Sequence, residues 1–251
     1  MRKSHVLLAA TFILGAVKLG SAADTPQRAP VLLELFTSEG CSSCPPADKL
    51  LQKLDRAQPV DGADLIVLSE HVDYWNHLGW TDPYSSAEFS KRQQNYASLL
   101  DSDVYTPQLV IDGRKQVVGS DRAAVDRAIE DSLRSPKIPV VVNAKREANG
   151  LEVHIEVSPI PGNKPASVYL VLAADQARSH VMRGENAGRE LEHVAVVQSL
   201  VKIADISNGS GLQKDIRSAL PPLAQAGNLR VDVFVQDAAS KRILGVGQAK
   251  L

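Results

Sequence analysis

The sequence predicts an α/β domain built on a mixed sheet, with the element order βαβαββα, followed by an all-β antiparallel sandwich. Before a proline-containing segment at 136–139, short apolar runs alternate with helical patterns; after it, strand-like runs recur between turn signals. With 44% hydrophobic and 23% charged residues, the composition is that of a globular protein. We therefore predict two domains, at 24–137 and 138–251.

Residues 1–23 have the pattern of a secretory signal peptide. Arg2 and Lys3 precede an almost wholly apolar run at 6–17, and small residues at 21–23 precede Asp24. That run is too short to cross a hydrocarbon core of about 30 Å at about 1.5 Å per residue. We expect cleavage, no membrane span afterwards, and an exported protein that is periplasmic or secreted. A formal net charge of −1 without a long basic run does not favour nucleic-acid binding.

The first half divides into clear elements. Apolar runs at 31–36 and 64–69 predict two buried strands, which should be parallel because a helix at 47–54 separates them. Pro45 and Pro46 fit the first turn of that helix. The remaining expected elements are a polar helix at 85–101, a hairpin of 108–111 with 116–118, and a last helix capped by Asp121.

The second half predicts mainly strands. Residues 151–157 alternate strictly between apolar and polar, which is typical of a strand with one buried face. A short helix is expected at 212–220. The expected strands are 140–142, 151–157, 167–173, 192–203, 230–236 and 242–247.

Both cysteines lie in one motif, Cys41-Ser42-Ser43-Cys44, at the predicted N-terminus of a helix. A disulfide across so short a loop adds little stability, which favours a redox or metal role. A helix N-terminus stabilises a thiolate, so Cys41 is the candidate nucleophile and Cys44 the resolving thiol. The Ser42 and Ser43 hydroxyls and N–H groups are placed to solvate that thiolate.

The order strand, CxxC at a helix start, parallel strand and X-Pro hairpin resembles the thioredoxin superfamily. Tyr105-Thr106-Pro107 and the run that follows are similar to the family's cis-proline strand. The resemblance implies that Pro107 is cis beside the cysteines and that the backbone of Thr106 receives an extended substrate. Tyr105 and Trp75 are the accompanying candidates for substrate binding, because aromatic side chains dominate binding surfaces.

A closer resemblance extends beyond the motif. The segments at 34–48, 71–75 and 78–85 are similar to an exported bacterial family of unknown function, number 1223, which is placed with the thioredoxin-like folds. The resemblance implies a fold and no reaction. We expect a thiol-disulfide oxidoreductase that acts on protein or small thiols with an unidentified redox partner and needs no cofactor or metal.

Two other functions remain open. His71 and Asp73 follow the second parallel strand, where one or both could lie near Cys41 and shift its pKa, or could simply bond their own loop. Cys41, Cys44 and His71 together would suit copper delivery. The third possibility is a non-catalytic binding scaffold with an inert CxxC.

Two further features of the second half carry weaker signals. Residues 183–189 combine two arginines with glycines; we expect a solvated hairpin turn, with an anion clamp or docking on the first domain as alternatives. His154 and His193 fit strand patterns and are expected to be ordinary sheet residues. Hydrolase motifs such as Gly-x-Ser-x-Gly and His-Glu-x-x-His are absent from the sequence.

Overall fold

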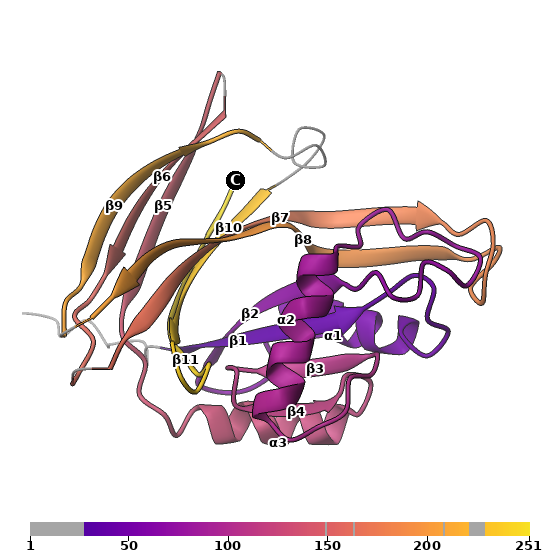
Figure 1. Ribbon diagram of the computed structural model, residues 1–251, viewed down its shortest axis with the longest axis horizontal. Coiled ribbons are helices and arrows are strands. Elements are labelled where there is room, and N and C mark those ends of the chain that lie inside the picture. Colours follow the sequence, from indigo (N-terminus) through magenta and orange to yellow (C-terminus); the bar gives the residue numbers. More distant parts are fainter. Residues whose placement is uncertain (1–27, 149, 163, 208, 221–228) are drawn as a thin grey trace, which may run out of the picture.

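The computed structural model describes residues 28–148, 150–162, 164–207, 209–220 and 229–251, so the predicted signal peptide lies outside the described residues. Two sheets organise the chain (Figure 1). A mixed sheet of eight strands has the order β11-β10-β7-β8-β2-β1-β3-β4, and a sheet of three strands has the order β5-β6-β9. Among the described residues, no helix is long and apolar enough to cross a membrane.

The first half contains the predicted elements in the predicted order. They are β1 (Ala29–Thr37), α1 (Pro45–Ala57), β2 (Ala63–His71), α2 (Ala87–Leu99), β3 (Gln108–Ile111), β4 (Lys115–Val118) and α3 (Arg122–Ser132). β1 and β2 are parallel, and β3 and β4 form the expected antiparallel hairpin. The ends of β1 and β2 therefore meet at one edge of the sheet, as predicted.

Helices cover both faces of this part of the sheet. Leu33 and Leu35 of β1 belong to the core cluster that includes residues of α1 and α3, whereas Leu32 belongs to a separate cluster with Phe89 of α2. Burial on both faces explains why β1 is a continuous apolar run rather than an alternating one. Glu34 is the one charged residue in that run, and it can be buried because Arg92 of α2 pairs with it at 2.5 Å.

The N-terminal cap of α3 is confirmed and gives a simple stability prediction. The Asp121 carboxylate accepts a hydrogen bond from the backbone N–H of Ala124 at 3.0 Å. Asp121→Ala is expected to lower the free energy of unfolding by about 1 kcal/mol, the usual value of such a cap. Urea denaturation measures this change, and Asp121→Asn, which can cap the same N–H, is the control that should lose much less.

The second half contains β5 (Val140–Glu147), β6 (Gly150–Val157), β7 (Ala166–His180), β8 (Glu190–Ile206), β9 (Leu212–Ser218), β10 (Leu229–Asp237) and β11 (Ile243–Lys250). The three-stranded sheet packs against β7 and β10 around a shared apolar core, which gives the sandwich-like layer. However, β7, β8, β10 and β11 also continue the sheet of the first half, because Ser69 of β2 pairs with Val196 of β8. The eight-stranded sheet thus crosses the predicted boundary at 137/138.

The helix expected at 212–220 is wrong. Residues 212–218 form strand β9, which pairs antiparallel with β6 from Leu151 against Ser218 to Val157 against Leu212. Leu212 and Ile216 are four residues apart and lie on one face of either a helix or a strand, so the short pattern was ambiguous. These residues form a strand rather than a helix because their main chain pairs with the otherwise free edge of β6.

The hairpin of β7 and β8 is the longest feature of the second half. Its paired residues run from Ala166 with Ile206 to His180 with Glu190. Figure 1 shows its tip reaching past α1 toward the loops that follow β1 and β2. This reach brings the C-terminal half of the chain to the CxxC motif.

Candidate functional site

Cys41 and Cys44 form a disulfide directly before α1, with their Cα atoms 5.4 Å apart. A turn forms because the N–H of Cys44 donates to the carbonyl of Cys41 at 3.2 Å. Cys44 is the N-cap residue of α1, and Pro45 and Pro46 occupy the first helical positions, where a missing N–H costs nothing. The motif therefore stands at a helix N-terminus, as the sequence predicts.

The cis-proline turn lies beside this motif. The Thr106–Pro107 peptide bond is cis, and Pro107 is buried. The Ser43 hydroxyl lies 3.4 Å from Cys41 Sγ and 3.4 Å from the carbonyl oxygen of Thr106, to which it donates. Ser43 thus connects the disulfide to the residue whose backbone is expected to receive substrate.

Trp75 forms one wall of the same region. Its indole Nε1 donates to Thr106 Oγ1 at 2.9 Å, and a Cβ placed on Gly40 would come within 3.0 Å of the Trp75 Cβ. The glycine before Cys41 therefore permits the close approach of Trp75. Of the predicted site residues, the structure gathers Cys41, Cys44, Ser42, Ser43, Trp75, Thr106 and Pro107.

Three predicted site residues make their contacts elsewhere. The Asp73 carboxylate accepts from the Ser90 hydroxyl of α2 at 2.5 Å, and the Tyr105 hydroxyl bonds to the Gln116 side chain of β4. His71 contacts Asp82, Tyr84 and His193, and none of these partners is a cysteine.

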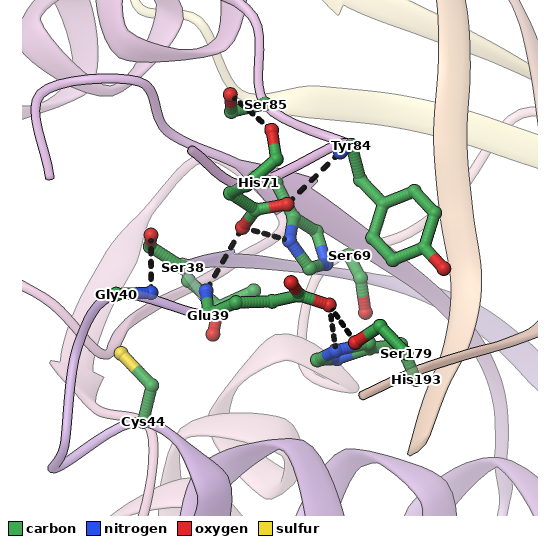
Figure 2. A network of polar contacts seen from close by, with 12 residues as sticks. Ser38, Glu39, Gly40, Cys44, Ser69, His71, Tyr84, Ser85, Ser179 and His193 are labelled. Atoms are coloured by element: carbon green, nitrogen blue, oxygen red, sulfur yellow. Dashed lines mark hydrogen bonds and ion pairs between the residues drawn. The ribbon is translucent and has the colours of Figure 1, made fainter. Parts of the chain in front are cut away.

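Behind the motif lies a buried network of acids and histidines (Figure 2). His71 Nδ1 bonds to the Asp82 carboxylate at 2.7 Å, and Asp82 also accepts from the N–H of Glu39 at 2.8 Å. The His193 ring lies 3.4 Å from the Glu39 carboxylate and 4.6 Å, between centroids, from the ring of His71. All four side chains are almost fully buried. His193 is therefore not the ordinary sheet residue that its strand pattern predicts.

Charge pairing controls the ionisation of this network. Burial lowers the pKa of His71, but the carboxylates of Asp82, Asp48 and Glu39 outweigh it, and the pKa is raised. The pKa of Asp82 is lowered, because His71 and two backbone N–H groups outweigh the effect of burial. Burial raises the pKa of Asp48, whose Oδ1 accepts from Thr37 at the end of β1 at 2.9 Å. These directions favour a charged His71–Asp82 pair.

The network touches the motif through the backbone rather than through sulfur. The Glu39 carboxylate accepts hydrogen bonds from Trp80 Nε1, at 2.8 Å, and from the Ser179 hydroxyl. The main chain of Glu39 continues through Gly40 to Cys41. Figure 2 shows Cys44 at one side of the network, with no interaction drawn to it. The network therefore holds the segment before Cys41 in position through its hydrogen bonds to Glu39.

No metal cluster is found at this site. Within the described ranges, no group of three or more His, Cys, Asp or Glu side chains is arranged to hold a metal ion. His71, the third ligand of the copper-delivery hypothesis, has its Nδ1 on Asp82 and faces His193. The copper hypothesis therefore gains no support from the arrangement of these side chains.

The loop at 183–189 is the exposed hairpin turn that the sequence predicts, except at Asn186, and it also contacts the motif. Asn186 is fully buried, and its Nδ2 donates to the carbonyl oxygens of Glu39, at 2.8 Å, and Cys41, at 3.0 Å. Glu185 accepts from the Ser42 N–H at 3.0 Å. Docking on the first half was the alternative that the sequence left open. Both cysteines are 0% exposed in this disulfide form.

Fold and site together define an α/β protein that carries a disulfide motif at a helix N-terminus. The chain belongs to the family described as protein of unknown function (DUF1223), whose model matches residues 32–236. The family resemblance seen in the sequence is thereby confirmed.

A solved structure agrees with this membership. A protein of Agrobacterium tumefaciens, determined in a structural genomics project, is 30% identical, covers 88% of this chain and 94% of its own, and superimposes with a TM-score of 0.67. The sporulation control protein Spo0M of Bacillus subtilis is 11% identical over 46% of this chain and 47% of its own, with a TM-score of 0.31, which carries no argument. No curated protein matches the sequence.

Proposed function

We propose that this protein is an exported thiol-disulfide oxidoreductase with a thioredoxin-like N-terminal domain, and that Cys41 and Cys44 exchange disulfides with protein or small thiols. The observation that carries this proposal is the disulfide at the start of α1, joined through Ser43 to the cis-proline turn at Thr106. Export to the periplasm or the medium rests on the pattern of residues 1–23. The site needs no group beyond the two sulfurs and a partner thiol.

The chemical step is a pair of displacements. A substrate thiolate attacks Cys41 Sγ and forms a mixed disulfide, the Cys41–Cys44 bond breaks, and Cys44 leaves as a thiolate that takes up a proton. A second thiolate then attacks the substrate sulfur and releases Cys41. Two thiols are thereby oxidised to one disulfide while the protein disulfide is reduced to two thiols. The reverse sequence reduces a substrate disulfide.

The helix N-terminus favours the anionic intermediates of both directions, because the positive end of its dipole stabilises negative charge. Thr106 lies two residues before β3, and we place the main chain that would receive an extended substrate there because its carbonyl accepts from Ser43 beside the disulfide. Trp75 fixes Thr106 through its side chain and so positions this edge.

The experiment that tests the proposal is the reduction potential of the Cys41–Cys44 pair, measured in glutathione buffers with trapping of free thiols. An exchange catalyst is expected between about −120 and −270 mV, and the position within that range indicates whether the protein oxidises or reduces. A potential below about −300 mV would contradict the proposal, because such disulfides are structural.

The burial of both cysteines favours one second candidate, a binding scaffold with an inert disulfide. In that case the sheet of the second half, rather than the motif, would carry the function. The two candidates differ in reactivity: a scaffold disulfide would resist both glutathione and protein thiols, whereas an exchange site would react with one of them.

A further inference from the structure

The loop of residues 181–189, which joins β7 to β8, closes over the CxxC motif. Its base is pinned by two backbone bonds, from Val181 N–H to the Arg189 carbonyl at 3.0 Å and from Gly188 N–H to the Val181 carbonyl at 2.8 Å. Gly184 has a φ of +79°, and a Cβ there would come within 3.2 Å of the Trp80 Cβ. The loop therefore has a defined shape that is fitted to the segment after β2.

Asn186 makes the central contacts of this loop. Its amide donates to two carbonyls of the motif segment, those of Glu39 and Cys41, and its own oxygen accepts from the Arg189 guanidinium at 3.0 Å. Displacing the Asn186 amide costs free energy, because it is fully buried and would lose these hydrogen bonds unless other partners replaced them. Arg189 orients the amide so that its nitrogen faces the motif.

Glu185 makes the second contact, at the motif itself. Its carboxylate accepts the N–H of Ser42, the residue that directly follows Cys41. That N–H is one of the groups expected to stabilise a thiolate at Cys41. Glu185 is exposed, so this contact can exchange with an incoming acceptor more readily than the buried contacts of Asn186.

Together Asn186 and Glu185 make hydrogen bonds with main-chain groups of the motif that a bound ligand could otherwise make. The loop offers a donor to the carbonyls of Glu39 and Cys41 and an acceptor to the N–H of Ser42. An extended polypeptide also presents main-chain donors and acceptors in alternation along its length. A small thiol has no such array, and a thiolate cannot attack a sulfur that it cannot reach.

We propose that the loop at 181–189 is an intrinsic cap of the exchange site, and that the substrates which displace it are extended protein segments rather than small thiols. This inference rests on the proposed function and names its substrate class. Asn186 and Glu185 are positioning residues in this scheme, because they control access to Cys41 and take no part in the exchange of sulfur.

The test compares two thiols on the oxidised full chain, 2-mercaptoethanol and a reduced, unfolded protein that contains cysteine, with maleimide trapping to follow the reduction of the disulfide. For the wild-type chain, we expect the protein thiol to react faster than 2-mercaptoethanol. Asn186→Ala is expected to increase the rate at which 2-mercaptoethanol reduces the disulfide about tenfold or more, because the variant loses two hydrogen bonds between the loop and the motif. Glu185→Ala should increase the same rate by a smaller factor. Because Glu185 is exposed, this variant still tests the cap if Asn186→Ala does not fold. Arg183→Ala, in the same loop and exposed, is the control that should leave the rate unchanged.

The outcomes separate this inference from the proposed function. Equal rates for 2-mercaptoethanol in the wild-type chain and both variants would overturn the cap while leaving exchange intact. A wild-type chain that reacts as fast with 2-mercaptoethanol as with the protein thiol would overturn the substrate class. A disulfide that stays oxidised with both thiols in every variant would instead overturn the proposed function.

Discussion

Cys41→Ser is expected to lower disulfide exchange with a protein substrate by about three orders of magnitude or more, because the hydroxyl cannot form a mixed disulfide. Cys44→Ser should behave differently. It keeps the attacking Cys41 and removes the thiol that resolves the intermediate, so the protein should accumulate as a one-to-one covalent adduct with its substrate. Exchange is measured by the regain of activity of a scrambled or reduced test enzyme, and the adduct by intact mass.

The two variants control for each other. Both lose the same disulfide, whose loop is so short that its removal should cost only about 2 kcal/mol of stability. Equal unfolding midpoints would therefore show that differences in exchange come from chemistry rather than from folding. An adduct formed through Cys44 in Cys41→Ser, with none in Cys44→Ser, would reverse the assignment of nucleophile and resolving thiol.

The expected roles depend on elements that local sequence patterns could predict. The strands at 31–36 and 64–69 are mainly apolar, with Glu34 as the one charged residue inside the first, and the helix that starts at Pro45 has a clear apolar face. Two such strands joined by a helix are parallel, so their ends share an edge. The position of CxxC at that edge and at a helix N-terminus follows from these local signals, and the structure agrees with both.

The parts that sequence patterns missed depend on pairs that lie far apart along the chain. Asn186 binds the carbonyls of Glu39 and Cys41 across about 145 residues, and nothing in the spacing of these residues indicates the contact. Likewise, Ser69 pairs with Val196, so the two halves share one sheet although their compositions suggest separate layers. The glycine-rich turn with two arginines is exposed as its composition indicates, and the composition does not show that Asn186 alone is buried against the motif.

The buried network shows the same limit for single residues. His193 lies in a strand, directly before the apolar run that begins at Val194, and a histidine in a strand pattern usually packs as an ordinary sheet residue. Its partner Glu39 lies in the turn before Cys41, and Asp48 lies on α1. No sequence signal marks these partners, because Glu39 and Asp82 lie in turn and loop patterns, where acids are usually exposed.

Asp82→Asn is expected to lower the free energy of unfolding by about 3–5 kcal/mol near pH 5.5, the usual cost of removing one partner from a buried ion pair. Asp82 faces His71 at 2.7 Å, and both side chains are fully buried. The asparagine keeps the shape and one acceptor oxygen for the Glu39 N–H but loses the acceptor for the Tyr84 N–H, so the pH dependence of the loss, rather than its size, tests the charge. Asp126→Asn is the matched control, because that carboxylate pairs with Arg122 at the surface and should cost less than about 1 kcal/mol.

The effect of Asp82→Asn should depend on pH in a defined direction. The pKa of His71 is raised in the folded protein, so the pair contributes fully below the unfolded-state value of about 6.5 and loses its contribution as the pH rises through the folded-state pKa. The pKa of Asp82 is lowered, so the contribution is present above about 3.9 and disappears as the pH falls through the lower folded-state value. The cost of the substitution is therefore greatest between these limits.

Urea denaturation of both proteins at pH 5.5 and pH 9.5 measures this difference. The other groups that surround His71 are Glu39, Asp48, Tyr84 and His193, and they are unchanged in the variant. We expect the gap between wild type and Asp82→Asn to shrink at the higher pH, because a neutral imidazole loses less when the carboxylate is removed. A gap of the same size at both values would contradict the expected titration, because it would mean that His71 keeps one protonation state from pH 5.5 to pH 9.5. In that case the contribution of the pair would not depend on pH in this range.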